Sequence, residues 1–257
     1  MQFLARAALL PVAFCLCATL PAVAQSVQQA SLSAVPPPQP GSLNWLYAWS
    51  GAGVTNTAQG GYLGAVAPVN GNLNLDGIAF RWDFAATRYG YTNSAASPLP
   101  FVNTRIDTTS GSFMAGYRKS FGESWLSGYV GAAYETHSNG DPAATLRGTE
   151  GGAKALVEYF TPLSNRLEAS ALASFASPFT TYYADAKVGY KIVDKVLIGP
   201  ESSVFGDIAY RESRFGGYIG FKTPTGQIDV AGGYLHPLSG NPDGYYVSVN
   251  FGVALNR

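Results

Sequence analysis

The sequence predicts an all-β protein: a single antiparallel transmembrane β-barrel of about 12 strands, of the outer-membrane type. Three observations lead to this prediction. Apolar and polar residues alternate in segment after segment of the chain. Charged residues are few while glycine and aromatic residues are abundant, and short connections alternate with mostly longer ones between the segments.

The alternation is clearest in the last segment, residues 244–257. Every second residue is apolar: Tyr245, Val247, Val249, Phe251, Val253 and Leu255. The residues between them are small, polar or amphipathic, and side chains in a strand point alternately to opposite faces. The segment is longer than an ordinary strand and matches the ~9–11 residues that cross a bilayer at a tilt. It therefore predicts a strand with one apolar and one wettable face.

The same pattern recurs upstream. It is found in residues 43–50, 62–69, 78–91, 110–120, 124–136, 150–160, 167–175, 182–192, 196–204, 214–222 and 228–235. In the segment 78–91, the apolar face holds Ile78, Phe80, Trp82 and Phe84, and the opposite face holds Arg81, Asp83, Thr87 and Tyr89. With the closing segment, these make an even number of strands, as bacterial single-chain barrels have.

Composition supports a membrane barrel over a secreted β-sandwich. Charged residues make up 12%, about half of the ~25% of an ordinary soluble domain, and a secreted sandwich should carry more surface charge. Glycine (30), tyrosine (16) and phenylalanine (14) are abundant. Lysine plus arginine equals aspartate plus glutamate at 16 each, so nothing indicates a nucleic-acid partner.

The chain divides into three parts. Residues 1–24 have a positive start, an apolar run and Ala22-Val23-Ala24 before Gln25, which predicts a secretory signal peptide. Both cysteines lie in this part, so the exported chain has no disulfide. Residues 25–42 are rich in Pro, Gln and Ser and predict an extended periplasmic linker, and residues 43–257 form the barrel.

The connections predict the orientation in the outer membrane. Short ones, at 70–77, 121–123, 162–166, 193–195 and 224–226, alternate with mostly longer ones at 51–60, 92–107, 137–149, 176–181, 206–213 and 236–243. Outer-membrane barrels have short periplasmic turns and long outer loops. With the linker inside, we expect both termini to be periplasmic.

Several motifs also resemble the cellulose biosynthesis protein BcsS family, from about residue 43 to the end. They are Tyr62-Leu63-Gly64-Ala65, Asp76-Gly77 with Arg81, Leu126-Ser127-Gly128-Tyr129-Val130-Gly131, Asp141-Pro142, Arg147-Gly148-Thr149-Glu150-Gly151-Gly152-Ala153-Lys154, Ile198-Gly199-Pro200-Glu201 and Arg214-Phe215-Gly216-Gly217-Tyr218. The resemblance implies a signal peptide, an envelope barrel and a link to cellulose production. It implies no catalytic residues.

The residues themselves do not favour an enzyme. Glu135, His137 and Ser138 are candidates for a hydrolase site, but adjacent residues of a strand point to opposite faces, so His137 cannot activate Ser138. Asp141 and Asp243 show no metal-ligand spacing. We therefore expect no catalytic residue, no metal site and no cofactor.

The inward charges form the candidate site. With aromatic residues that could stack on sugar rings, the candidate lumen and glycan-contact residues are Arg81, Asp83, Tyr89, Trp125, Arg147, Glu150, Lys154, Glu158, Asp185, Lys187, Glu201, Arg214 and Tyr218, and Glu168, Lys191 and Tyr183 share their face. Two interpretations remain open. The charges line a polar pore, or they pair across a narrow lumen and satisfy one another, because unpaired buried charge is unfavourable.

Glu150 and Lys154 lie four residues apart and so point inward together, about 13 Å apart at ~3.3 Å per residue. With Arg147 just before the strand, they are expected to order the lumen near the cell surface.

The expected function is an accessory role in bacterial cellulose export or surface assembly. The alternatives are a general small-solute porin and a structural or adhesive barrel that acts through its outer loops. The expected partners are outer-membrane lipid and a glucan chain or other components of cellulose synthesis.

Overall fold

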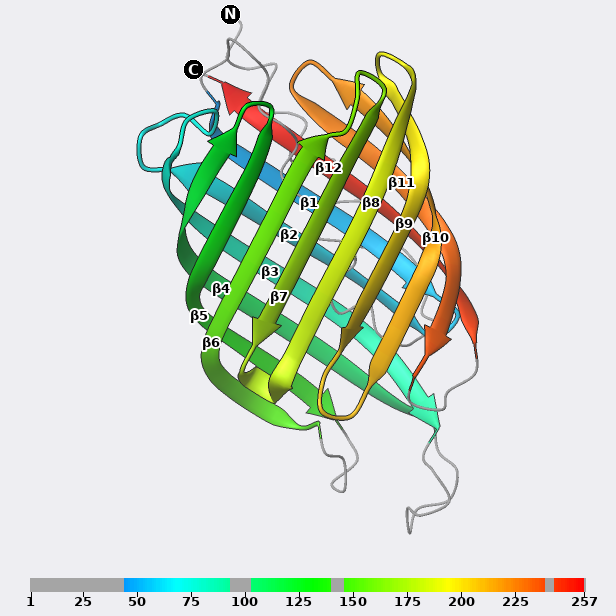
Figure 1. Ribbon diagram of the computed structural model, residues 1–257. Coiled ribbons are helices and arrows are strands. Elements are labelled where there is room, and N and C mark those ends of the chain that lie inside the picture. Colours follow the sequence, from blue (N-terminus) through cyan, green and yellow to red (C-terminus); the bar gives the residue numbers. More distant parts are fainter. Residues whose placement is uncertain (1–43, 93–102, 140–145, 239–242, 257) are drawn as a thin grey trace, which may run out of the picture.

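Twelve antiparallel strands close into a barrel in which each strand pairs with the next along the chain and β12 pairs with β1 (Figure 1). The structure is a computed structural model that describes residues 44–92, 103–139, 146–238 and 243–256. The elements are β1 (Asn44–Thr55), β2 (Ala58–Pro68), β3 (Gly77–Thr92), β4 (Asn103–Phe121), β5 (Ser124–Asn139), β6 (Gly148–Pro162), β7 (Leu167–Ala176), the 3₁₀ turn η1 (Pro178–Thr180), β8 (Thr181–Val193), β9 (Val196–Gly206), β10 (Arg211–Thr223), β11 (Gly226–Pro237) and β12 (Gly244–Asn256). The predicted fold class and strand number are confirmed. The predicted signal peptide and the predicted linker lie outside the described residues.

Two details of the prediction are wrong. β4 begins at Asn103 rather than near 110, because the strand continues through polar residues such as Asp107 and Thr109. The predicted long connection 51–60 is only Asn56 and Thr57, since β1 and β2 run through its glycines. A side-chain carbon at Gly51 would lie 2.5 Å from the Tyr62 hydroxyl. The glycines there make room for aromatic rings and do not break the strands.

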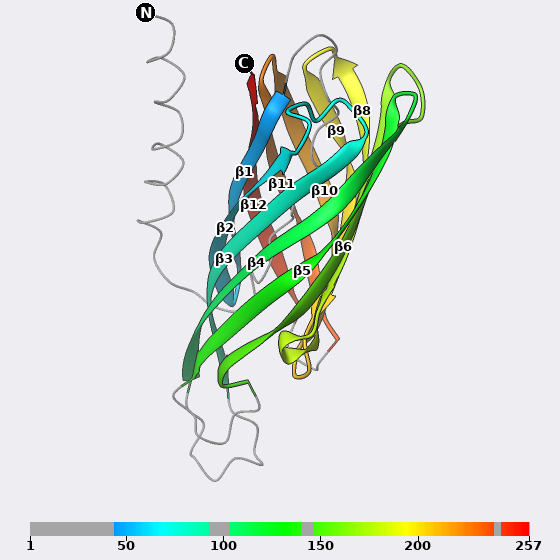
Figure 2. The same cartoon turned by 90° about the vertical axis from the view of Figure 1, so that its left-hand side faces the viewer.

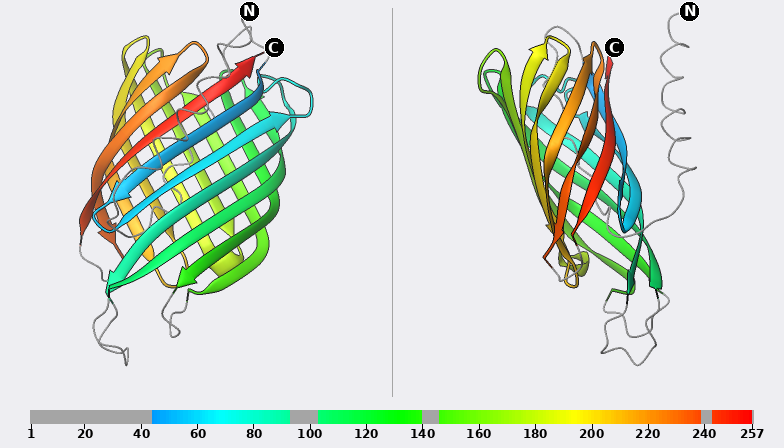
Figure 3. Two further views of the ribbon diagram at one scale, coloured as in Figure 1. Left: turned by 180° about the vertical axis from the view of Figure 1, so that it is seen from behind. Right: turned by 90° about the vertical axis from the view of Figure 1, so that its right-hand side faces the viewer.

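The barrel is flattened. It is broad in Figure 1 and much narrower when turned by 90° in Figure 2, and Figure 3 shows the same from the other sides. β1 starts and β12 finishes at one end, which we call the terminal end; the connection between β1 and β2 lies at the opposite end, which we call the loop end. The two broad walls therefore face each other across a narrow interior.

The outer wall is apolar. Large side chains point outward from every strand, such as Phe113 (57% exposed) and Val130 (67%), which a soluble protein would not leave in so continuous a surface. Aromatic side chains gather toward both ends of this wall. They are Tyr117, Phe121, Tyr159, Tyr190, Phe221 and Phe251 toward the terminal end, and Tyr134, Phe175, Phe215, Tyr234 and Tyr245 toward the loop end, while Phe80, Trp82, Phe84 and Phe113 continue across the wall on β3 and β4. Two aromatic girdles around an apolar band are typical of a membrane-spanning barrel.

The inner wall packs aromatic rings onto glycines of strands that lie one or two places away in the sheet. A side-chain carbon at Gly64 would meet the Trp49 ring at 2.5 Å, and one at Gly216 would meet the Tyr246 hydroxyl at 2.6 Å. Buried apolar residues from β1 to β9 join into one cluster that spans the interior. The abundance of glycine and aromatic residues thus has a structural cause, which is that flat rings can lie against a wall without side chains.

A side chain from a connection lies in the interior at each end. Leu73, between β2 and β3, is 3% exposed, and its amide donates to the Asn44 carbonyl at the terminal end. Phe179 of η1 is also 3% exposed and packs its ring edge-on against His137 at the loop end. Both residues belong to the packing of the interior.

Within the described residues, no helix has the length and apolar character that spanning a membrane requires. That part of the chain also has no group of three or more histidine, cysteine or acidic side chains arranged to hold a metal ion.

Candidate functional site

The inward charges of β3 and β6 meet across the interior. Arg81 Nη1 donates to Glu158 Oε2 at 2.9 Å, and both side chains are 0% exposed. Arg81 Nε also donates to Asp83 Oδ1 at 3.2 Å, and Lys154 Nζ lies 3.5 Å from Asp83 Oδ2. The Trp49 ring covers the guanidinium at 4.5 Å. In this part of the interior, the charged side chains pair with one another across a narrow lumen and do not line an open polar pore.

A second group of charges lies between β8 and β12. Lys187 Nζ is 3.1 Å from Glu201 Oε2, and the Tyr246 hydroxyl donates to Glu201 Oε1 at 2.8 Å. Asp185 lies on the same inner face of β8 as Lys187 and is 7% exposed. The charges in this half of the barrel are also buried.

Two further ion pairs lie nearer the ends of the barrel. Arg214 Nε donates to Glu212 Oε1 at 2.6 Å in the loop-end half. At the terminal end, Glu168 accepts from Lys222 Nζ at 2.7 Å and lies 3.7 Å from Lys191 Nζ. Glu212 was missed by the sequence analysis because the expected strand started only at 214.

The aromatic candidates have no free face for a sugar ring. Trp125 is 1% exposed, with Arg118 stacked 4.1 Å from its ring centre and Phe160 against it. Lys187 lies 5.3 Å from the ring centre of Tyr218, and Tyr89 is 8% exposed near His137. These rings are parts of the packed interior.

Two candidates, Glu150 and Arg147, lie at the loop-end rim. Glu150 is exposed at the loop-end rim, where Oε2 accepts a hydrogen bond from the backbone N–H of Phe179 at 2.7 Å. Arg147 is exposed just before β6. The alternation assigned Glu150 to the correct side of the strand, but β6 extends there beyond the enclosed part of the barrel. Lys154 and Glu158 are thus buried inside the barrel, whereas Arg147 and Glu150 are exposed at its rim.

The sequence analysis did not assign Arg118 to the interior and considered His137 only as a hydrolase candidate, although the alternation puts both on the inner face of their strands. Arg118 is 2% exposed, and its Nε and Nη2 have no hydrogen-bond partner among the described residues. His137 is fully buried, and its Nε2 lies 2.7 Å from Glu135 Oε1. Arg118 on β4 and His137 on β5 both point inward. Arg118 shares the inner face of β4 with the buried Met114, four residues before it.

An acidic group with local backbone hydrogen bonds also lies at the loop-end rim. Asp207, between β9 and β10, accepts hydrogen bonds from the amides of Ala209 at 2.7 Å and Tyr210 at 2.8 Å. Burial raises the pKa of Asp207 above its usual value, although these two amides act in the opposite direction. The short loop from Asp207 to Tyr210 is thus fixed at the edge of the interior.

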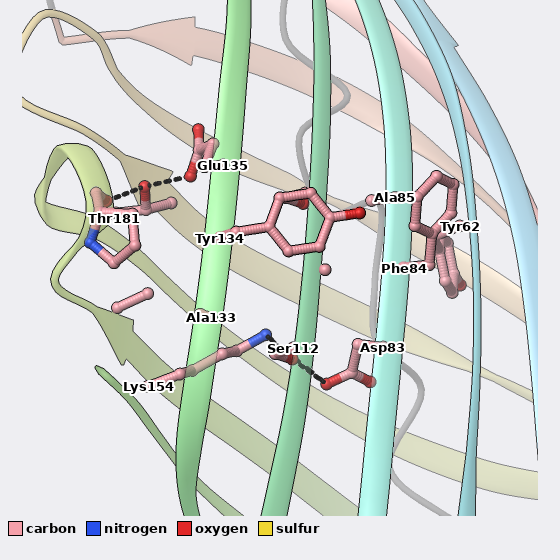
Figure 4. Close-up of a pocket in the computed structure, with 14 residues that line it drawn as sticks. Tyr62, Asp83, Phe84, Ala85, Ser112, Ala133, Tyr134, Glu135, Lys154 and Thr181 are labelled. Carbon is pink, nitrogen blue, oxygen red and sulfur yellow. Dashed lines mark hydrogen bonds and ion pairs between the residues drawn. The ribbon is translucent and has the colours of Figure 1, made fainter. Parts of the chain in front are cut away.

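A hollow remains in the interior near the loop end (Figure 4). It has a volume of about 520 Å³, including the solvent that it opens to. Its inward-facing lining consists of Tyr62, Asp83, Ala85, Ser110, Ser112, Ala133, Glu135, Lys154, Ala176, Pro178 and Thr181. Beside the hollow, the side chains of Arg81 and Glu158 have no surface open to solvent.

The apolar outer wall, the aromatic girdles and the polar interior define a β-barrel of the outer-membrane type. A solved structure with a similar fold is the COG4313 outer membrane channel from Pseudomonas putida F1, with a TM-score of 0.51 and 11% identity over 90% of this chain and 100% of that one. Another is the TodX deltaS2S3 mutant monoaromatic hydrocarbon channel, with a TM-score of 0.50 and 6% identity over 82% and 89% of the two chains. At these identities the likeness shows the fold alone.

The family model for cellulose biosynthesis protein BcsS matches residues 47–255. The match covers most of the chain, which therefore belongs to this family, as its motifs indicated. No curated protein matches the chain. The protein is thus an outer-membrane-type barrel linked to cellulose biosynthesis.

Proposed function

We propose that this protein is an accessory component of cellulose export or surface assembly in the outer membrane, and that it acts as a filled barrel and not as a conduit for the glucan. The family supports the link to cellulose. The observation that carries the second part is the Arg81–Glu158 pair, which crosses the interior without exposed surface.

A glucan that passed through the barrel would have to separate this pair and displace the rings around it. Separation would leave two charges in an interior that offers them no water, which is strongly unfavourable. The buried apolar cluster from β1 to β9 closes the same cross-section. A narrow interior of paired charges suits a barrel whose function lies at its ends and surfaces.

The proposal places both termini in the periplasm and the loop end at the cell surface. It also assigns the protein no catalytic role. His137 is buried and bonded to Glu135, while Ser138 is exposed on the opposite face of β5. The partners are then outer-membrane lipid, the emerging glucan or other components of cellulose synthesis, met at the rims.

A deletion strain tests this function. The strain should lose dye-binding cellulose at its surface, keep its permeability to small antibiotics and nutrients, and regain cellulose when the gene is supplied in trans. In a planar bilayer, the purified protein should show no steady conductance. A strain with normal cellulose and reduced permeability would replace this proposal with a general porin.

A further inference from the structure

The hollow near the loop end exists because small side chains line one part of the inner wall (Figure 4). Asp83, Ser112 and Ala133 lie in one row across β3, β4 and β5, and Ala85, Ser110 and Glu135 lie in the next. Large rings fill the interior elsewhere.

The Lys154 ammonium points into this hollow and is only loosely held. Its side chain is 6% exposed, and its nearest oxygen atoms are Ser112 Oγ at 3.4 Å and Asp83 Oδ2 at 3.5 Å. Charge-assisted hydrogen bonds of an ammonium are ordinarily ~2.7–2.9 Å long. A buried ammonium with three donors and no short partner among the described residues can accept an oxygen ligand without losing a good bond.

The polar groups around the hollow include both donors and acceptors. Asp83 and Glu135 supply carboxylate oxygens, and Lys154 supplies N–H groups. Ser110, Ser112 and Thr181 add hydroxyl groups, which can donate or accept a hydrogen bond. The lining itself has two carboxylates against one ammonium, and Arg81 is shared between Asp83 and Glu158, so an anionic ligand would gain no net attraction.

We propose that this hollow binds one uncharged, hydroxyl-rich sugar unit. A sugar hydroxyl donates to a carboxylate and accepts from an ammonium at the same time, which is the combination that the lining requires. The alanines Ala85, Ala133 and Ala176 offer the apolar patches against which the C–H face of a sugar ring packs. This inference rests on the proposed function, from which it takes the glucan as the source of the sugar.

The experiment measures sugar binding by the purified full chain in detergent. Cellotetraose and glucose are titrated separately by calorimetry, which distinguishes a chain end from a free sugar. Saturable binding of either supports the site, and tighter binding of cellotetraose assigns it to a chain end. Absence of saturable binding by both overturns it.

Ala133→Leu fills the hollow and should abolish binding. Ala132→Leu is the matched control, because Ala132 is the next residue of β5 and faces outward, so binding should stay at the wild-type value. Lys154→Met keeps the side-chain length and should weaken binding about tenfold or more through the loss of one charged hydrogen bond. Heat-modifiable gel migration verifies that each variant folds.

Unchanged binding by folded Ala133→Leu overturns the proposed site. If that variant does not fold, Lys154→Met decides, and unchanged binding by it overturns the site equally. None of these results alters the cellulose phenotype of the deletion strain, so the sugar site and the proposed function can fail independently.

Discussion

A buried ion pair constrains each of its members more strongly than an exposed pair does. Arg81 has no exposed surface and is bonded to both Glu158 and Asp83. Taking such charges out of water is unfavourable, and only close, well-oriented partners compensate for it. Arg81 and its two partners therefore act as one unit, and a change in one member leaves the others without compensation.

Glu158→Gln should destabilise the barrel strongly. It removes the negative partner but keeps the shape of the side chain, and the loss expected for an unpaired buried charge is roughly 3–5 kcal/mol, reduced in part by Asp83. Denaturant unfolding of the protein refolded in detergent measures this free energy. Asp107→Asn is the control, because its pair with Arg88 is 51% and 40% exposed and should contribute less than about 1 kcal/mol. Equal losses in the two variants would contradict a dry interior.

At the scale of the strand, alternation alone predicted most of the fold. In β12, Tyr245, Val247 and Phe251 are exposed on the outer wall while Tyr246 and Asn250 are buried, as the pattern indicated. The pattern could not predict how far the interior is filled. The packing of Trp49 on Gly64 depends on the register of β1 against β2, in which the two residues lie opposite each other, and this register does not follow from one segment alone.

The same limit applies to the site. The inward side of Arg81, Asp83 and Lys154 follows from local alternation, but the contact of Lys154 with Asp83 joins strands that are three apart. Glu150 and Lys154 are an even number of residues apart and so point to the same face of β6, yet the sequence does not show where the enclosed part of the barrel ends. The face of a strand to which a side chain points is a local property, whereas the extent of the enclosed interior depends on all twelve strands.

Two substitutions in β12 test both faces. Val249→Arg puts a charge on the lipid face and should cost ~2–4 kcal/mol if the position is near the middle of the bilayer. Asn250→Arg would be tolerated in a wet lumen, but Asn250 is 2% exposed and accepts from the Tyr62 hydroxyl at 2.5 Å. We therefore expect both variants to lose the heat-resistant folded band on a gel. Normal migration of Asn250→Arg would show a spacious interior.

The turn η1 carries backbone strain. Phe179 has φ 46° and Thr180 has φ 54°, a region that β-branched residues rarely adopt. Thr180→Gly should raise the free energy of unfolding by about 1 kcal/mol, because glycine takes this conformation freely. Thr109→Gly in β4 is the control and should lower it by about 0.5–1 kcal/mol, since an extended strand gains nothing from glycine. A loss of stability in Thr180→Gly would show that the turn is unstrained.

At the scale of the whole molecule, the filled interior and the lipid-facing wall make two separate environments for tryptophan. Trp49 and Trp125 are 4% and 1% exposed inside the barrel, while Trp82 is 37% exposed on the outer wall. In an open pore, water would reach Trp49 and Trp125. In a packed interior, water reaches neither of them.

Fluorescence quenching separates these possibilities. In a variant with Trp45→Phe and Trp82→Phe, the emission of Trp49 and Trp125 should be insensitive to iodide in the folded protein and sensitive after unfolding in urea. In the wild type, brominated lipid should quench the contribution of Trp82. Strong iodide quenching of the folded variant would contradict the filled barrel.

The seam between β1 and β12 joins the two ends of the described chain, with Ala48 opposite Val253 and Val54 opposite Val247. All other strand pairings of the barrel connect consecutive hairpin partners. Folding can therefore advance from one hairpin to the next, but the sheet keeps two unpaired edges until the final strand is in place. A chain that stopped before Gly244 would expose the edges of β1 and β11, each ready to pair with another copy. Only a chain that includes β12 can pair both of these edges. An incomplete chain would therefore be prone to aggregation or proteolysis, and this difference separates complete from incomplete copies of the protein in the cell.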